Sequence, residues 1–472
     1  MSIHPPLPVR RESPVQPGMF VTGGSSQSAV LQQSASVFLA QVALLVCGVA
    51  NSFLVAYLVG PEGRGLVYLM QFIAGGIGLT LLNFGLGPAS VFYLGREARH
   101  SLSEVAAGVL WASLLLGALP MLLLVPAWHW IAGLATKKIA GAYLWLALGV
   151  IPAMNLTFNA GFLSLAQKRT GTYNWLRVSP SILFSLSLIV VLFSRSRTIW
   201  IVALTWTATS IVPGLFALEV IRRGGSMRWT KGAQKFLRDG LRFSWHSHLG
   251  AVTQYLQHRS DILLVSYFLP LKELGLYAFA VSLAELLWYV ANAVGTVLMP
   301  HVAGSLENEA SGITPMVCRA TLSLTALLSV GLAAASSWLI PRILPAFHES
   351  VRVLWILIPG AVAASVFKVL ASDFNGRGKP IETFYPAAIA LGSGLVCGTL
   401  MIPRFGIWGA AVVSTFGYLL NATLYLRSYS RIAAVPIPNL LFVRAEDFSV
   451  ASGLKREWMA RSAGKSRVPQ CD

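Results

Sequence analysis

NSFLVAYLVGPEGRGL (residues 51–66) ends one long apolar stretch and begins another. DILLVSYFLPLKELGL (residues 261–276) repeats this pattern 210 residues later, and five of the sixteen positions are identical. About 20 apolar residues cross a ~30 Å hydrocarbon core as a helix, and a helix satisfies its backbone polar groups within one segment. Each stretch therefore predicts a tight joint between two membrane-spanning helices.

Similar apolar stretches recur along the whole chain, separated by short loops. Of the 472 residues, 55% are hydrophobic and 11% are charged, and the mean hydropathy is +0.65. We predict an all-α integral membrane protein with about twelve transmembrane helices, at residues 32–58, 66–94, 103–126, 139–166, 173–194, 198–221, 243–269, 275–300, 314–341, 351–372, 381–403 and 407–430.

The repeat predicts how these helices are grouped. Six helices separate its two copies, so both halves enter the membrane in the same orientation. Parallel repeats form transporters with a site between the halves; chance similarity of two helix joints is the alternative. We expect six-helix bundles at residues 31–221 and 243–431, a basic linker at 222–242, a polar N-terminal segment at 1–30 and a basic tail at 432–472.

The chain offers little room for other domains. Its longest link between helices is too short for a catalytic or nucleotide-binding domain, and no Gly-rich loop ends in Gly-Lys-Ser/Thr, so we expect no direct use of ATP. The first 30 residues lack the apolar core and cleavage site of a signal peptide, so the first helix should act as an uncleaved anchor.

The net charge of +18 has two interpretations. Lys and Arg hold loops on the cytoplasmic side, or they attract anionic lipids or an anionic substrate. Loops on the side of the two termini carry 23 basic residues, against nine in the opposite loops, which include Arg64. This bias predicts cytoplasmic termini. The membrane helices argue against nucleic acid as the partner.

The seventh helix is the least apolar. Its polar residues fall within an arc of roughly 100° at 100° per residue: Ser247, Gly250, Gln254, Gln257, His258 and Asp261. Arg259 lies on a flank of this arc. Ionisable residues at membrane depth are costly and usually line cavities or pair with each other, so this face should avoid lipid.

Arg259 and Glu285 should lie at the same depth, because they are thirteen residues before and after Lys272 in the joint between helices. Two interpretations stay open. The residues form an ion pair that fastens the hairpin, or Arg259, with His258, faces a cavity and meets an anionic ligand. Arg177 and Lys368 either serve at the cavity or extend to the interface. We expect no metal site and no catalytic residue.

Three stretches resemble the polysaccharide and oligosaccharide flippase branch of the multidrug/oligosaccharidyl-lipid/polysaccharide exporter superfamily. They are Leu58-Val-Gly-Pro-Glu-Gly-Arg-Gly-Leu66, Asp261-Ile-Leu-Leu-Val-Ser-Tyr-Phe with Leu274-Gly-Leu-Tyr-Ala278 and Met299-Pro300, and Ile402-Pro-Arg-Phe-Gly-Ile-Trp-Gly-Ala-Ala411. With the helix count, the resemblance covers residues 30 to 430.

The resemblance implies two bundles in a V shape that rock between inward-open and outward-open forms. It also implies a lipid-linked glycan as cargo, usually on undecaprenyl diphosphate in the bacterial cytoplasmic membrane, for exopolysaccharide, O-antigen or capsule assembly. Further implied partners are membrane lipids, a coupling proton or sodium ion, and glycan polymerase and export machinery. No cofactor is implied. The substrate-binding candidates in the cleft are Arg259, His258, Arg177, Lys368, Gln254, Asp261 and Glu285.

Two other functions are alternatives to this one. A cation-coupled multidrug exporter of the same fold would need an acidic residue for ion exchange, and Asp261 and Glu285 are the strong candidates. A glycan polymerase or ligase would need a large external loop with catalytic residues, and the external loops here are short.

Overall fold

The computed structural model of the chain describes residues 24–97, 100–135, 141–225, 227–304, 307–442 and 444, which are almost entirely helical and contain no strand. Most of the predicted terminal segments, 1–30 and 432–472, lies outside these residues. The elements are α1 (Gly24–Phe72), η1 (Ile73–Leu81), α2 (Leu86–Phe92), η2 (Tyr93–Glu97), α3 (Leu102–Ala135), α4 (Gly141–Gly149), α5 (Ile151–Ala166), α6 (Thr170–Phe193), α7 (Ile199–Arg223), α8 (Lys231–Phe268), α9 (Leu271–Ala284), η3 (Glu285–Leu287), α10 (Trp288–Gly304), α11 (Glu307–Ile343), η4 (Pro345–Phe347), α12 (His348–Gly376), α13 (Ile381–Ala433) and α14 (Pro438–Leu441).

Nine helical stretches of the described chain are long and apolar enough to cross a membrane. Two of them, Ser36–Leu81 and Ile381–Ala433, each contain a sharp break, at Gly60 and Gly406. The φ angles there are 64° and 59°, which a residue without Cβ adopts at little cost. Division of these two stretches at their glycines gives eleven helices. α8 is the twelfth; it is too polar to be among the nine apolar stretches. The described chain therefore has the twelve predicted helices.

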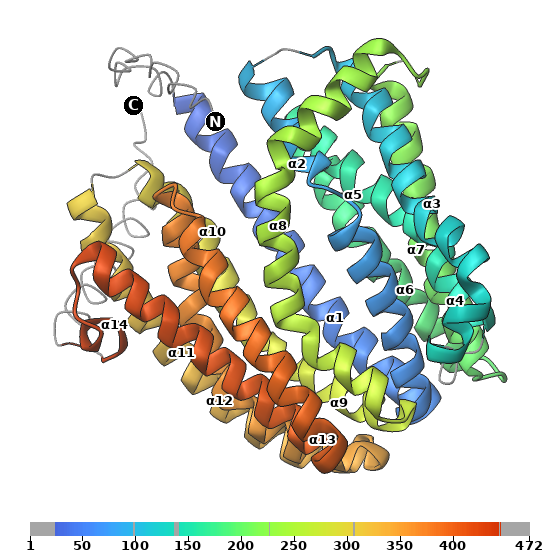
Figure 1. Cartoon of the computed structure of the whole chain (residues 1–472), viewed down its shortest axis with the longest axis vertical. Helices are drawn as coiled ribbons and strands as arrows, with labels where there is room; N and C mark the ends of the chain where they lie inside the picture. Colours follow the sequence, from blue (N-terminus) through green and yellow to red (C-terminus); the bar gives the residue numbers. More distant parts are fainter. Residues whose placement is uncertain are drawn as a thin grey trace, which may run out of the picture.

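The helices form two bundles, as predicted (Figure 1). In the N-terminal bundle, α5 packs against α2, α3, α6 and α7. In the C-terminal bundle, α12 packs against α9, α10, α11 and α13. Addition of 210 to the residue numbers of α5 gives residues within α12, so the two bundles use equivalent central helices.

The two copies of the sequence repeat touch each other where the bundles meet. A Cβ atom on Gly65 would lie 2.0 Å from the carbonyl oxygen of Leu271, and one on Gly275 would lie 1.8 Å from that of Pro61. Gly65 and Gly275 are 210 residues apart, and so are Pro61 and Leu271. This reciprocal contact is expected where parallel repeats meet on their symmetry axis.

α8 belongs to both bundles. Thr230 caps its start by accepting a hydrogen bond from the backbone N–H of Ala233 (3.1 Å), so most of the segment expected as a linker is helical. Phe236 is buried in the core of the N-terminal bundle, and the backbone carbonyl of Asp239 accepts a hydrogen bond from the Tyr93 hydroxyl (3.2 Å). The helix also packs extensively against α13 and runs between the two groups of helices (Figure 1).

Candidate functional site

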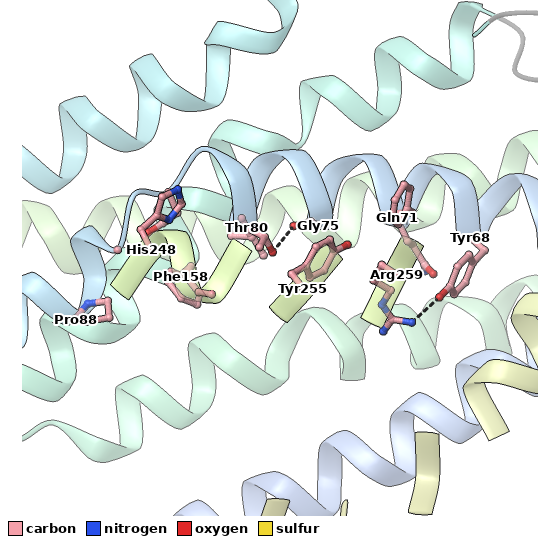
Figure 2. A pocket seen from close by; sticks show the side chains of 14 residues that line it. Tyr68, Gln71, Gly75, Thr80, Pro88, Phe158, His248, Tyr255 and Arg259 are labelled. Carbon is pink, nitrogen blue, oxygen red and sulfur yellow. Dashed lines mark hydrogen bonds between the residues drawn. The ribbon is translucent and has the colours of Figure 1, made fainter. Parts of the chain in front are cut away.

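A cavity of about 810 Å³ lies between α8 and the second membrane-spanning helix, which comprises residues 61–72 of α1 together with η1 and α2. Its wall is formed by Tyr68, Gln71, Phe72, Gly75, Leu79, Thr80, Asn83, Gly85, Pro88, Phe158, His248, Ala251, Tyr255 and Arg259. Figure 2 shows these side chains strung along the two helices, with Arg259 and Tyr68 at one end and His248 and Pro88 at the other. The cavity is therefore elongated along the helices, and its two ends differ in chemistry.

The second helix is interrupted beside this cavity. It continues from α1 through η1, breaks at residues 82–85 and resumes as α2. Phe84 and Gly85 have positive φ angles of 52° and 68°, and the Ser244 hydroxyl of α8 donates a hydrogen bond to the Gly85 carbonyl (3.0 Å). Irregular backbone at membrane depth is tolerated where it is buried in protein or lines a cavity, and Asn83 and Gly85 of this break line the cavity.

Arg259 both pairs with Glu285 and faces the cavity, so the two arrangements that its sequence position left open occur together. Its Nη1 lies 2.6 Å from Glu285 Oε1, its Nη2 donates to Glu285 Oε2 (3.2 Å), and its Nη1 also donates to the Tyr68 hydroxyl (2.9 Å). The predicted ion pair is present, and the arginine also lines the cavity. Glu285 belongs to the C-terminal bundle and Tyr68 to the N-terminal bundle, so Arg259 links the two.

Part of the polar arc predicted for the seventh helix points into the C-terminal bundle. Asp261 is buried and accepts hydrogen bonds from the hydroxyls of Tyr277 (2.6 Å) and Ser414 (2.7 Å). The His258 ring packs between Trp288 and Phe367, with centroids 5.2 and 5.8 Å away. The neighbouring arc, which carries Arg259, faces the cavity. The sequence predicted that the polar face of this helix avoids lipid, but the choice between cavity and bundle interior depends on its neighbours.

The other basic candidates lie outside the wall of this cavity. Lys368 Nζ lies 4.6 Å from the centroid of the Trp288 ring, within the C-terminal bundle. Arg177 donates a hydrogen bond to Gln41 Oε1 (2.7 Å) and lines a second cavity of about 420 Å³ in the N-terminal bundle. Leu79 and Phe158 line both cavities, so these adjoin. Gln254 is half-buried and lines neither of the two.

Sequence reasoning missed two groups of polar residues. Arg64, counted above as an external loop charge, is 4% exposed and donates to the hydroxyls of Ser52 (3.2 Å) and Ser282 (3.0 Å). Ser52 and Ser282 are on different bundles, so Arg64 also links them. Asn83 was missed because residues 66–94 were expected to form one helix, although Gly85, Gly87 and Pro88 signal a break beside it. No group of three or more His, Cys, Asp or Glu residues in the described part of the chain could hold a metal ion.

Comparisons with known proteins agree with this architecture. The model of the family described as "Polysaccharide biosynthesis protein" matches residues 30–306. Among solved structures, the lipid II flippase MurJ in an inward closed conformation superposes with a TM-score of 0.65 at 15% identity, covering 87% of this chain and 89% of that chain. A multidrug resistance MATE family transporter of the MOP superfamily in an inward-facing conformation gives 0.62 at 16% identity, with coverage of 83% and 95%.

A mutant of the Vibrio cholerae MATE transporter VcmN gives a TM-score of 0.59 at 15% identity, with coverage of 87% and 99%. At these identities the similarity shows a shared fold. No curated protein matches the chain.

Proposed function

Because the chain belongs to the polysaccharide biosynthesis protein family, we propose that it is a flippase that moves a lipid-linked oligosaccharide or polysaccharide precursor across a membrane. The family and the structural neighbours are transporters rather than enzymes, and the chain is a multi-pass membrane protein of their fold. The proposed membrane is the bacterial cytoplasmic membrane, with both termini in the cytoplasm, and the proposed pathways are exopolysaccharide, O-antigen or capsule assembly.

The observation that carries this proposal is the elongated cavity with Arg259 in its wall. A diphosphate is polyanionic and cannot cross hydrocarbon unaided, whereas a guanidinium at membrane depth lowers its energy there. Arginine also presents a planar fork of donors that matches phosphate oxygens. The lipid tail of such a substrate can stay in the bilayer while its head group passes between the bundles.

Arg259 is the first phosphate contact in this proposal. Glu285 holds the guanidinium when substrate is absent, and phosphate oxygens replace Glu285 and Tyr68 when it binds. Arg177, at the adjoining cavity, is the second basic candidate. Lys368 contributes positive charge and His258 contributes packing from within the C-terminal bundle, and Gln254 and Asp261 support α8.

Alternating access would follow from relative movement of residues 31–221 and 243–431. The bundles touch at Gly65 and Gly275 and are linked by the contacts of Arg259 with Tyr68 and of Arg64 with Ser282. Separation of the two bundles where Arg259 contacts Tyr68 and Arg64 contacts Ser282 would break both of these contacts. A proton or sodium ion is the proposed energy source for this movement.

A cation-coupled multidrug exporter is the alternative, because the fold is shared with MATE transporters. Its ion-exchange candidates are both engaged here: Asp261 accepts from Tyr277 and Ser414, and Glu285 is paired with Arg259. These contacts favour the flippase.

Complementation of a glycan-producing host that lacks its flippase tests the proposal. Wild type should restore surface glycan, and Arg259→Ala should lower it at least tenfold at equal expression, since charged hydrogen bonds contribute about 1.5–3 kcal/mol. The matched control is Arg342→Ala, because Arg342 is exposed, donates to the Trp338 carbonyl (2.8 Å) and lies outside the cavity. Failure of wild type with several lipid-linked glycans, together with drug resistance, would favour the exporter.

A further inference from the structure

The cavity has a second polar end, at the break in the second helix. Asn83 Nδ2 donates to the Oδ1 atoms of Asn155 and Asn159 (both 3.2 Å), and Asn159 Nδ2 donates to the Ser113 hydroxyl (3.0 Å). These residues come from the second helix, α5 and α3. Asn83 is 4% exposed and forms part of the cavity wall, and Asn155 is 1% exposed and lies behind Asn83, outside the wall itself.

Two atoms of this network lack a partner among the described residues: Asn83 Oδ1 and Asn155 Nδ2. One is an acceptor and the other is a donor. A buried polar atom without a partner costs about 1–3 kcal/mol, and this cost would be removed by a ligand group that both donates and accepts. A hydroxyl group does both.

The surroundings of this end suit a neutral, hydroxylated ligand. Phe158 and Tyr255 contribute aromatic surface to the cavity, and the rings of Phe84 and His248 lie 4.9 Å apart beside the break. Of the described residues in the wall, Arg259 alone carries a permanent charge. The amide end therefore attracts no ion, whereas the opposite end does.

The two ends are too far apart to bind the same chemical group. His248 and Arg259 mark them on α8, and eleven residues at 1.5 Å each separate their Cα atoms by about 16 Å. A ligand that satisfies both ends must carry an anionic group and, some distance away, hydroxyl groups. A glycan attached through a diphosphate has this order of groups.

We propose that Asn83 and Asn155 form a subsite for sugar hydroxyl groups, placed at the break in the second helix so that the cavity binds the glycan as well as the diphosphate. This inference rests on the proposed function. In this assignment Arg259 binds the part common to all prenyl diphosphate carriers, and the asparagines bind the part that differs among them.

Binding to the purified full-length chain tests the assignment with two probes: undecaprenyl diphosphate and the same lipid carrying a disaccharide. Asn83→Ala and, separately, Asn155→Ala should weaken binding of the disaccharide probe about three- to tenfold, the equivalent of one neutral hydrogen bond. Binding of the sugar-free probe should stay unchanged. Asn155→Ala removes the donor and leaves the Asn83–Asn159 hydrogen bond in place.

Asn51→Ala is the matched control, because Asn51 hydrogen-bonds Ser181 and Ser185 within the N-terminal bundle and lies outside the cavity. It should bind both probes as wild type does. Equal weakening of both probes by the Asn83 and Asn155 variants, or no weakening of either, would overturn the subsite but leave the flippase intact. If wild type binds neither probe, the proposed function fails and the subsite fails with it.

Discussion

At the scale of single residues, Arg259 occupies a position where a charge is costly, and the contacts that lower this cost come from both bundles. Glu285 supplies a carboxylate 2.6 Å away, and Tyr68 supplies a hydroxyl acceptor. A buried charge that loses its partner is strongly destabilising, whereas removal of both partners is often tolerated. The pair therefore couples the stability of the protein to the site that we propose for phosphate.

A double-mutant cycle measures this coupling. Arg259→Gln and Glu285→Gln should each destabilise the purified protein, and the double variant should lose less than the sum of the two losses. The expected interaction free energy is about 1–3 kcal/mol, measured by thermal unfolding in detergent. Additive losses would show that the two side chains do not depend on each other.

The pairing of Arg259 with Glu285 was one of the alternatives that the sequence allowed, because equal spacing from a hairpin joint fixes equal depth. Which side of α8 faces the cavity was not predictable. His258 and Arg259 are adjacent in the sequence, yet one packs against Trp288 and the other lines the cavity. This difference depends on where α13 and the second helix lie against α8, which the sequence of one helix does not specify.

At the scale of elements, the crossing of α1 and α9 leaves no room for side chains. The Cβ positions of Gly65 and Gly275 overlap backbone carbonyl oxygens, and a backbone oxygen cannot rotate away as a side chain can. Gly65→Ala and Gly275→Ala should each force the helices apart and cost about 1–3 kcal/mol, as overpacking does. Thermal unfolding measures the loss.

Gly48→Ala serves as the control for this crossing. Gly48 is also in α1, and a Cβ added there meets nothing within 4 Å. Its melting temperature should equal that of wild type or exceed it, since alanine is the better helix former. If the melting temperature of Gly65→Ala also equals that of wild type, the helices do not cross as closely as described.

Apart from α8, the helices were predictable from apolar length, and both glycine joints fell between predicted spans. The break at residues 82–85 was not predicted, although Gly85, Gly87 and Pro88 beside it are helix-breaking residues. Asn83 becomes conspicuous once Asn155, Asn159 and Ser113 are known to surround it. These partners are at least 30 residues away in the chain, so they emerge only when the bundle is assembled.

At the scale of the whole molecule, a repeat of sixteen positions predicted two bundles, and the structure brings its two copies into reciprocal contact. The cavity beside α8 has Arg259 at one end and Asn83 at the other. α8 packs on both bundles, so any movement of one relative to the other must bend α8 or release one of its contacts. The sidedness of the termini rests on loop charge and remains part of the proposal.

Transfer in reconstituted vesicles tests the central claim most directly. Purified wild type and Arg259→Gln would be incorporated at equal density into vesicles that contain an undecaprenyl diphosphate-linked disaccharide, labelled on the sugar. The measured quantity is the rate at which the label becomes accessible on the opposite leaflet. The account predicts a rate well above that of protein-free vesicles for wild type, and at least tenfold slower transfer for Arg259→Gln. A wild-type rate equal to that of protein-free vesicles under every imposed proton or sodium gradient, with a cationic dye transported instead, would contradict it.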